Sequence, residues 1–338
     1  MSEGVSVGEH RRLPVLDGVR ALSIIAVLAT HFMPAWLFGQ SWSVTIGVFG
    51  MALFFILSGF LITEQLLRHG PPLEFAKRRL LRVVPAAWLC ALIVALFQPI
   101  DPDVLLGHLF FYANLPPQSL VKPLDHYWSL CVEVQFYVIA FFLLWLRPAA
   151  TRWALPIMLA GTSLLRIHLG ATNPLSITWY RIDDLLAGGC LALVFSSRHW
   201  PAVRGALDRS ALPWLAAVAL FAACVALPVF DNWLSYLRPY AAAAFVATLL
   251  ASSGGWMTQQ LKRPWMHYVA QVSYAVYIWH LPLAATWLGS GDLLEKYLKR
   301  PLLLLAVFAV AHLSTFYFER PILALGKRQG RRVATQET

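Results

Sequence analysis

Long apolar stretches recur along the whole chain, and short polar segments separate them. A helix needs about 20 apolar residues to cross the hydrocarbon core of a bilayer. The apolar stretches predict transmembrane helices near residues 15–35, 44–67, 83–100, 127–146, 154–170, 179–197, 211–229, 237–253, 268–288 and 301–319. A further apolar piece, 104–113, is too short to span and predicts a re-entrant or interfacial segment. The expected fold is an all-α polytopic membrane protein of about ten transmembrane helices.

The composition agrees with this pattern. Hydrophobic residues make up 59% of the chain and charged residues only 13%, whereas soluble domains carry about 25% charged residues. The first apolar run resembles a signal peptide, but it is long enough to span, contains Arg20 and His31, and lacks a small-residue cleavage site. We therefore expect an uncleaved first helix.

The formal net charge of +10 would suit a nucleic-acid-binding protein, but the basic residues gather in short loops between apolar runs. That distribution follows the positive-inside rule, so no nucleic-acid partner is expected. Most of the 27 Lys and Arg residues fall on one side when the N-terminus is placed in the cytoplasm. The predicted organisation is a cytoplasmic segment (1–12), a transmembrane domain (13–321) and a basic cytoplasmic tail (322–338), with both termini cytoplasmic.

Two ionisable residues share one face of the first predicted helix. An ionisable group in a bilayer costs about 2.5–3.5 kcal/mol on insertion scales, so each needs a partner, a cavity or a function. Arg20 and His31 point the same way about 16 Å apart along the axis, and Asp17 lies one turn before Arg20, where it can pair with it. A structural hydrogen bond is the alternative for His31. Its shared face with Arg20 favours a function, and imidazole suits general-base catalysis.

A second polar stripe follows the segment that begins at Tyr127. Ser129, Glu133 and Tyr137 recur every four residues and predict one helix face turned to the interior. Glu133 either orients or protonates a catalytic group, or balances an arginine; the sequence leaves both open.

Two further groups carry polar chemistry. Arg181 and Asp184 lie one turn apart, which favours a local structural ion pair. Tyr277 and His280 follow Tyr274 at three-residue spacing, which is typical of packing or an interfacial belt, although His280 is harder to assign to packing.

The basic segment Phe75 to Arg82 begins another span with four cations. Taken alone, an anchor to anionic lipid is the favoured interpretation. The alternative is a site for a phosphate-rich cytosolic donor, because arginine forks match phosphate oxygens. Nucleotide-loop and HExxH motifs are absent from the sequence, and its four cysteines lack metal-type spacing. Neither a metal nor a bound cofactor is expected.

Taken in order, seven segments resemble the acyltransferase-3 family of polytopic membrane acyltransferases. They are Leu16 to Arg20 with His31; Phe54 to Ile62; Phe75 to Pro85; Trp128 to Leu130 with Glu133 and Gln135 to Tyr137; Arg181 to Asp183; Ser273 to His280; and Glu319 with Pro321. Many relatives have an arginine where this chain has Phe316, which weakens the assignment of Glu319. Some relatives also carry an SGNH-hydrolase-like domain, and we expect this chain to be a stand-alone form without one.

The resemblance implies transfer of an acyl group, usually acetyl, from cytosolic acyl-CoA to a hydroxyl of a glycan or lipid-linked glycan at a bacterial cytoplasmic (inner) membrane. It implies that His31 acts as base or acyl carrier, with Glu133 supporting it. It also implies that Arg20, Arg78, Arg79 and Arg82 bind the donor or organise the site. The other candidate site residues are Asp17, Ser58, Trp128, Ser129, Tyr137, Arg181, Asp183, Tyr277, His280 and Glu319.

Two alternatives stay open. A small natural product such as a macrolide could replace the glycan as acceptor. A proton-coupled transporter would use His31, Glu133 and Asp183 as a relay, but the paired halves typical of many transporters are not visible in the sequence.

Overall fold

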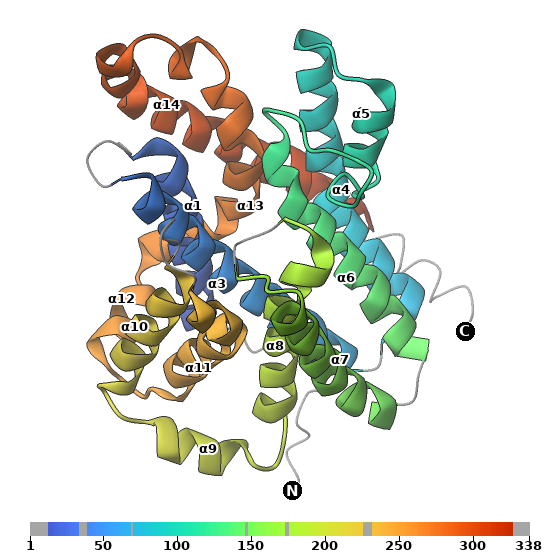
Figure 1. Cartoon of the computed structure of the whole chain (residues 1–338), viewed down its shortest axis with the longest axis vertical. Helices are drawn as coiled ribbons and strands as arrows, with labels where there is room; N and C mark the ends of the chain where they lie inside the picture. The colour runs from blue at the N-terminus through green and yellow to red at the C-terminus, as the bar shows by residue number, and fades with distance from the viewer. Residues whose placement is uncertain are drawn as a thin grey trace, which may run out of the picture.

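The computed structural model of the protein describes residues 13–33, 39–68, 70–145, 148–172, 176–225 and 232–326. Across these ranges the chain is helical, with thirteen α-helices and four short 3-10 or π segments (Figure 1). The predicted cytoplasmic segment 1–12 and residues 327–338 of the predicted tail lie outside the described residues.

Each of the ten predicted spans coincides with a helix. These helices are α1 (Pro14–Phe32), α3 (Gln40–Leu66), α4 (Pro72–Phe97), α6 (Trp128–Trp145), α7 (Pro148–His168), α8 (Thr178–Phe195), α10 (Leu212–Cys224), α11 (Arg238–Ala251), α13 (Pro264–Ala284) and α14 (Leu293–Leu313). The short apolar piece 104–113 contains α5 (Pro102–Leu109), which is too short to span. The remaining elements are α9 (Trp200–Leu207), α12 (Trp256–Leu261), η1 (Asp125–Tyr127), η2 (Trp233–Leu237), η3 (Trp287–Gly289) and the π segment η4 (Ser314–Glu319).

The helices identify a polytopic membrane protein. By length and composition alone, six described helices can cross a membrane, and a seventh span arises if α9 and α10, bent by 90° at their junction, count as one. Helix α8 carries Arg181, Asp183 and Asp184 within its 18 residues, and ionisable groups make a membrane span costly. Large apolar side chains such as Leu96, Phe97 and Trp145 are exposed, as lipid contact requires.

Helix α3 forms the centre of the bundle, with α1 and α8 packed along it. Two glycines permit the close approach of α3 and α8. A Cβ at Gly59 would lie 1.9 Å from the carbonyl oxygen of Leu185, and one at Gly188 would lie 2.1 Å from that of Ile56. Small residues at helix crossings are a general device for tight packing in membranes. This crossing fixes the height of α8 against α3.

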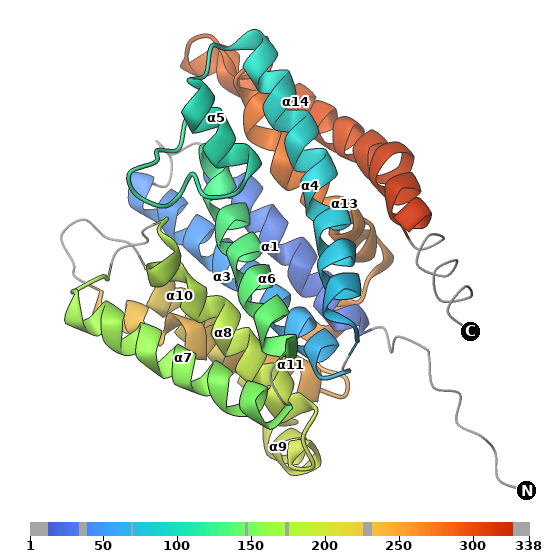
Figure 2. The same ribbon diagram turned by 90° about the vertical axis from the view of Figure 1, so that its right-hand side faces the viewer.

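Two pairs of helices flank this centre. Figure 2 shows α1, α3, α4 and α6 running along one common direction, with α7 and α8 on one side and α13 and α14 on the other. Helix α13 packs against both α1 and α14. As a result, the end of α1, the end of α13 and the start of α6 meet at one end of the bundle.

Candidate active site

Three histidines from different elements meet where these helix ends converge. His31 lies in the last turn of α1, His126 in η1 and His280 near the end of α13. The ring centroid of His280 is 5.1 Å from that of His31 and 5.1 Å from that of His126. His126 and His280 are buried, whereas His31 is exposed.

Backbone carbonyls fix the buried rings. His126 Nε2 donates to the carbonyl oxygen of Ile278 at 3.2 Å, and His280 Nδ1 donates to that of Tyr277 at 2.6 Å. A carbonyl only accepts, so these nitrogens are assigned the protons. The opposite nitrogens, His126 Nδ1 and His280 Nε2, are buried without a hydrogen-bond partner in the described structure. Each therefore presents a lone pair that can accept a hydrogen bond.

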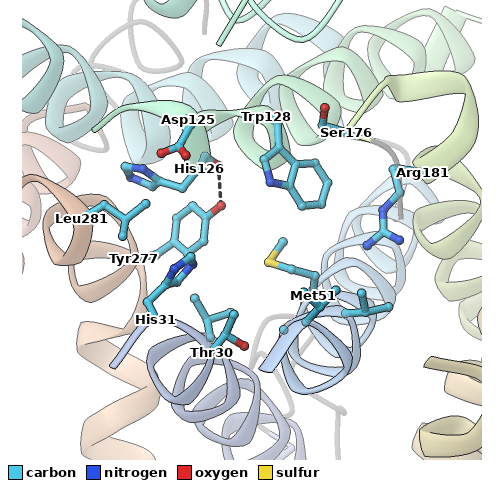
Figure 3. A pocket seen from close by; sticks show the side chains of 14 residues that line it. Thr30, His31, Met51, Asp125, His126, Trp128, Ser176, Arg181, Tyr277 and Leu281 are labelled. Atoms are coloured by element: carbon cyan, nitrogen blue, oxygen red, sulfur yellow. Dashed lines mark hydrogen bonds between the residues drawn. The ribbon is translucent and has the colours of Figure 1, made fainter. Parts of the chain in front are cut away.

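The exposed face of His31 opens into a cavity of about 390 Å³, a size typical of small-molecule sites. We call it the histidine cavity. Its polar lining comes from Thr30, His31, Asp125, His126, Ser176, Arg181 and Tyr277, and its larger apolar lining residues include Met51, Trp128 and Leu281. Figure 3 shows His31, Tyr277 and His126 on one side of this space and Arg181 on the other.

Hydrogen bonds from neighbouring helices support the histidine side. The Tyr277 hydroxyl donates to the backbone carbonyl of His126, and Ser129 Oγ therefore acts as donor to the Tyr277 oxygen. The ring of Tyr277 also lies 5.3 Å from that of His126. Ser129 and Tyr277 thus hold η1 in place against α13.

Glu133 occupies a second polar group, deeper in the bundle. Its Oε1 accepts hydrogen bonds from Ser58 Oγ at 2.9 Å and from the Tyr137 hydroxyl at 2.7 Å. The stripe of Ser129, Glu133 and Tyr137 is buried, as its spacing predicts. Glu133 does not line the histidine cavity. It interacts electrostatically with Arg20 and Arg79, which favours the arginine-balancing role among the two left open.

Arg20, Arg79 and Arg82 form what we call the arginine cluster, around Glu133. Arg79 lies over the Tyr137 ring at 5.7 Å and donates to Gln65 Oε1 at 2.9 Å through Nη2. Arg82 interacts electrostatically with Arg20 and with buried Glu319, whose Oε1 accepts from Ser314 Oγ at 2.8 Å.

One candidate, Arg78, lies apart from both groups. It is exposed and forms an i,i+4 ion pair with Glu74, so it belongs to the outer surface of α4. Asp17 interacts electrostatically with Arg20 of the arginine cluster and also contacts Nδ1 of His267 at 3.0 Å.

The predicted local ion pair between Arg181 and Asp184 is wrong. Asp184 accepts from Arg238 Nε, with both carboxylate oxygens at 3.1 Å. Asp183 pairs with Arg166 and with Arg238 Nη2, the latter at 3.4 Å. Arginines from α7 and η2–α11 reach these carboxylates because both elements pack on α8. We call the four residues Arg166, Asp183, Asp184 and Arg238 the carboxylate–arginine network.

Arg181 points elsewhere. Its guanidinium lies 5.2 Å from the centroid of the Trp128 ring and 5.9 Å from that of Phe55. Its Nε and Nη1 are buried and have no hydrogen-bond partner within the described ranges.

Sequence reasoning missed Asp125 and His126, because they fall between the predicted spans 83–100 and 127–146. The available signal was position: His126 lies two residues before Trp128, which begins a segment already singled out. Arg166 and Arg238 were also missed, since their partners are distant in sequence. Nearby His108 of α5 packs on Tyr127 at 5.8 Å, and burial lowers its pKa.

No group of three or more His, Cys, Asp or Glu side chains within the described ranges has a metal-binding arrangement.

Comparison with known proteins gives a consistent picture. A family model described as an acyltransferase domain matches residues 13–320. The chain is 27% identical to "Peptidoglycan O-acetyltransferase OatA" of Listeria monocytogenes over 93% of its own length and 56% of the relative's. It is 27% identical to "O-acetyltransferase OatA" of Staphylococcus aureus over 81% and 51%, respectively.

A third relative, "Putative peptidoglycan O-acetyltransferase YrhL" of Bacillus subtilis, is 27% identical over 94% of this chain and 56% of the relative. The chain thus spans about half the length of these curated relatives. No solved structure matches it.

Proposed function

The chain belongs to the acyltransferase-3 family, whose model matches residues 13–320, and from this premise we propose that it transfers an acetyl group from cytosolic acetyl-CoA to a hydroxyl of a cell-surface or exported glycan. One observation carries the proposal: exposed His31 opens into a cavity that His126, with its unpartnered Nδ1, also lines, and the His280 ring packs against both imidazoles. The names of the relatives support a glycan acceptor.

The proposed chemistry is acyl transfer through His31. As a general base, His31 takes the proton of the acceptor hydroxyl while the oxygen of that hydroxyl attacks the thioester carbonyl of the donor. The carbon–sulfur bond breaks, the CoA thiolate leaves and takes up a proton, and an O-acetyl ester forms. As an acyl carrier, His31 would instead accept the acetyl group first and then pass it to the acceptor. Both routes use the same imidazole.

The arginine cluster suits the donor. Arg20 lies about 16 Å from His31 along α1, so a long donor can reach the imidazole while its phosphates stay at the cluster. Arginine forks match phosphate oxygens. Arg78, exposed and paired with Glu74, would contribute at the rim of such a site.

The topology is part of the proposal. Ten helices coincide with the predicted spans, and the positive-inside distribution favours cytoplasmic termini. We place the protein in the bacterial cytoplasmic membrane, in contact with lipid, with the arginine cluster toward the cytoplasm and the histidine cavity toward the outer face.

A cellular experiment tests the function. The gene is deleted, then complemented with the wild type or with His31→Ala, and acetyl esters on envelope glycans and on secreted metabolites are measured by mass spectrometry. We expect glycan acetylation to be lost on deletion, restored by the wild type and absent with His31→Ala at equal protein level in the membrane. Loss of a metabolite's acetyl group instead would identify a natural-product acceptor. Full acetylation with His31→Ala would refute the catalytic role.

A further inference from the structure

Arg181 is a buried cation that forms no ion pair or hydrogen bond with a carboxylate among the described residues, although the charges of Asp183 and Asp184 act on it from a distance. The two carboxylates on its own helix, Asp183 and Asp184, are held by Arg166 and Arg238. This part of α8 therefore gathers three guanidinium groups around two carboxylates. Arg181 is only 1% exposed, and its Nε and Nη1 lack hydrogen-bond partners. A buried charge left unpaired is strongly unfavourable, so the arrangement calls for an anion from outside the chain.

The cavity gives that anion a place. Arg181 lines the histidine cavity, and Figure 3 shows its guanidinium across the space from His31. The rings of Trp128 and Phe55 lie 5.2 and 5.9 Å from the guanidinium, which fixes its position by cation–π contact. The cavity also has one carboxylate in its lining, Asp125, which Figure 3 places beside His126, away from Arg181. Asp125 therefore does not neutralise this cation.

We propose that Arg181 binds an anionic oxyacid group of the acceptor, a carboxylate or a phosphate, and so turns the acceptor hydroxyl toward His31. A guanidinium fork matches the paired oxygens of either group. Trp128 adds an aromatic face to the same wall, against which a sugar ring can pack. This inference rests on the proposed function, and it narrows the acceptor class from glycans in general to glycans that carry an anion.

The donor is a weaker candidate for this anion. The phosphates of the donor are proposed to bind at the arginine cluster. This cluster lies around Glu133, which is more than one helical turn along α6 from Trp128. Binding at Arg181 would place those phosphates at the acceptor end instead.

The experiment uses the full chain in lipid nanodiscs and two matched pairs of disaccharides. Cellobiuronic acid and its methyl ester differ in a carboxylate. Cellobiose 1-phosphate and methyl cellobioside differ in a phosphate. Equilibrium binding is measured for each by calorimetry, and acetyl transfer from acetyl-CoA is measured in parallel. Arg181→Gln removes the charge, Arg181→Lys keeps it, and Arg198→Gln is a matched control on the exposed loop after α8.

We expect the wild type to bind at least one charged disaccharide about 10- to 100-fold more tightly than its neutral partner, the range expected for a charge-assisted hydrogen bond. A preference within the first pair would identify a carboxylate as the anion that Arg181 binds. A preference within the second pair would identify a phosphate. Arg181→Gln should lose the preference while binding the neutral sugar as before, Arg181→Lys should keep part of it, and Arg198→Gln should keep all of it.

Equal binding of charged and neutral sugars by the wild type would overturn the inference. So would an Arg181→Gln variant, folded by size-exclusion chromatography, that weakens both members of a pair equally. The binding and transfer measurements separate the two claims. Charge-selective binding without acetyl transfer would refute the proposed function alone, and acetyl transfer without charge selectivity would refute this inference alone.

Discussion

Helix α8 contributes to two groups of buried charges that are satisfied in different ways. In the carboxylate–arginine network, all four carboxylate oxygens of Asp183 and Asp184 accept hydrogen bonds, and only Nε of Arg166 lacks a partner. Around the histidine cavity, Asp125 Oδ1, His126 Nδ1 and two nitrogens of Arg181 are buried without a hydrogen-bond partner. The same holds for Nε2 of His280, whose ring packs beside that of His31.

This difference separates structure from function. Buried polar groups in folded proteins are nearly always hydrogen-bonded, so each unsatisfied group needs an explanation. The network closes on itself and joins α7, α8 and α11. The cavity leaves its hydrogen-bonding capacity unused and is open on the side of His31, as a substrate site requires.

The largest expected effect comes from breaking the network. Asp183→Asn leaves two buried guanidinium groups with one carboxylate, and breaking a buried ion pair costs about 3–5 kcal/mol. We expect a lower midpoint of unfolding in detergent and little folded protein. The matched control, Asp103→Asn on the exposed start of α5, should change the free energy of unfolding by about 0.5 kcal/mol or less. Equal stability of the two variants would mean that the network is not structural.

The second test addresses the histidine side. His126→Ala should lower the rate of acetyl transfer by about 100-fold or more, the usual effect of losing a general acid or base, and should lower stability by about 1 kcal/mol or more because it removes the hydrogen bond to the carbonyl of Ile278. His126→Gln can still donate to the carbonyl of Ile278 but has no ring nitrogen to accept a proton. Its rate should therefore match that of His126→Ala. A fully active His126→Gln would show that His126 only positions the loop.

A third test extends the comparison to the arginine cluster. Arg79→Lys keeps the charge but loses the fork that reaches Gln65 and faces the Tyr137 ring. We expect the KM for acetyl-CoA to rise about 10-fold, the loss of one charge-assisted hydrogen bond, at an unchanged KM for the acceptor. A change in the KM for the acceptor alone would assign Arg79 to acceptor binding instead of donor binding.

The smallest expected effect comes from removing the hydrogen bonds that hold η1 in place beside the histidine cavity. Tyr277→Phe removes the hydroxyl that joins Ser129 to the carbonyl of His126, and a hydrogen bond of this kind contributes about 1 kcal/mol. The unfolding midpoint should fall slightly and the rate of transfer should drop severalfold. A loss as large as that of His126→Ala would indicate that the hydroxyl itself takes part in the reaction.

The sequence predicted the helices because each is a long apolar run, a property of local composition. It also predicted the inward face of Glu133, since helical spacing determines which residues share a face. It misassigned the partner of Asp184, because spacing reveals only neighbours on the same helix, whereas Arg238 arrives from another element. His126 was missed for a related reason: η1 is polar and irregular, and only tertiary packing turns it against α13.

The central claim is that His31 carries out acetyl transfer in the histidine cavity. The direct measurement is transfer of radiolabelled acetyl from acetyl-CoA to a glycan acceptor by the purified full chain in nanodiscs, for the wild type and for His31→Gln. We predict transfer by the wild type and a rate at least about 100-fold lower for His31→Gln, with the two proteins equally folded and binding acetyl-CoA equally well. A His31→Gln variant that transfers acetyl at the wild-type rate would contradict the account.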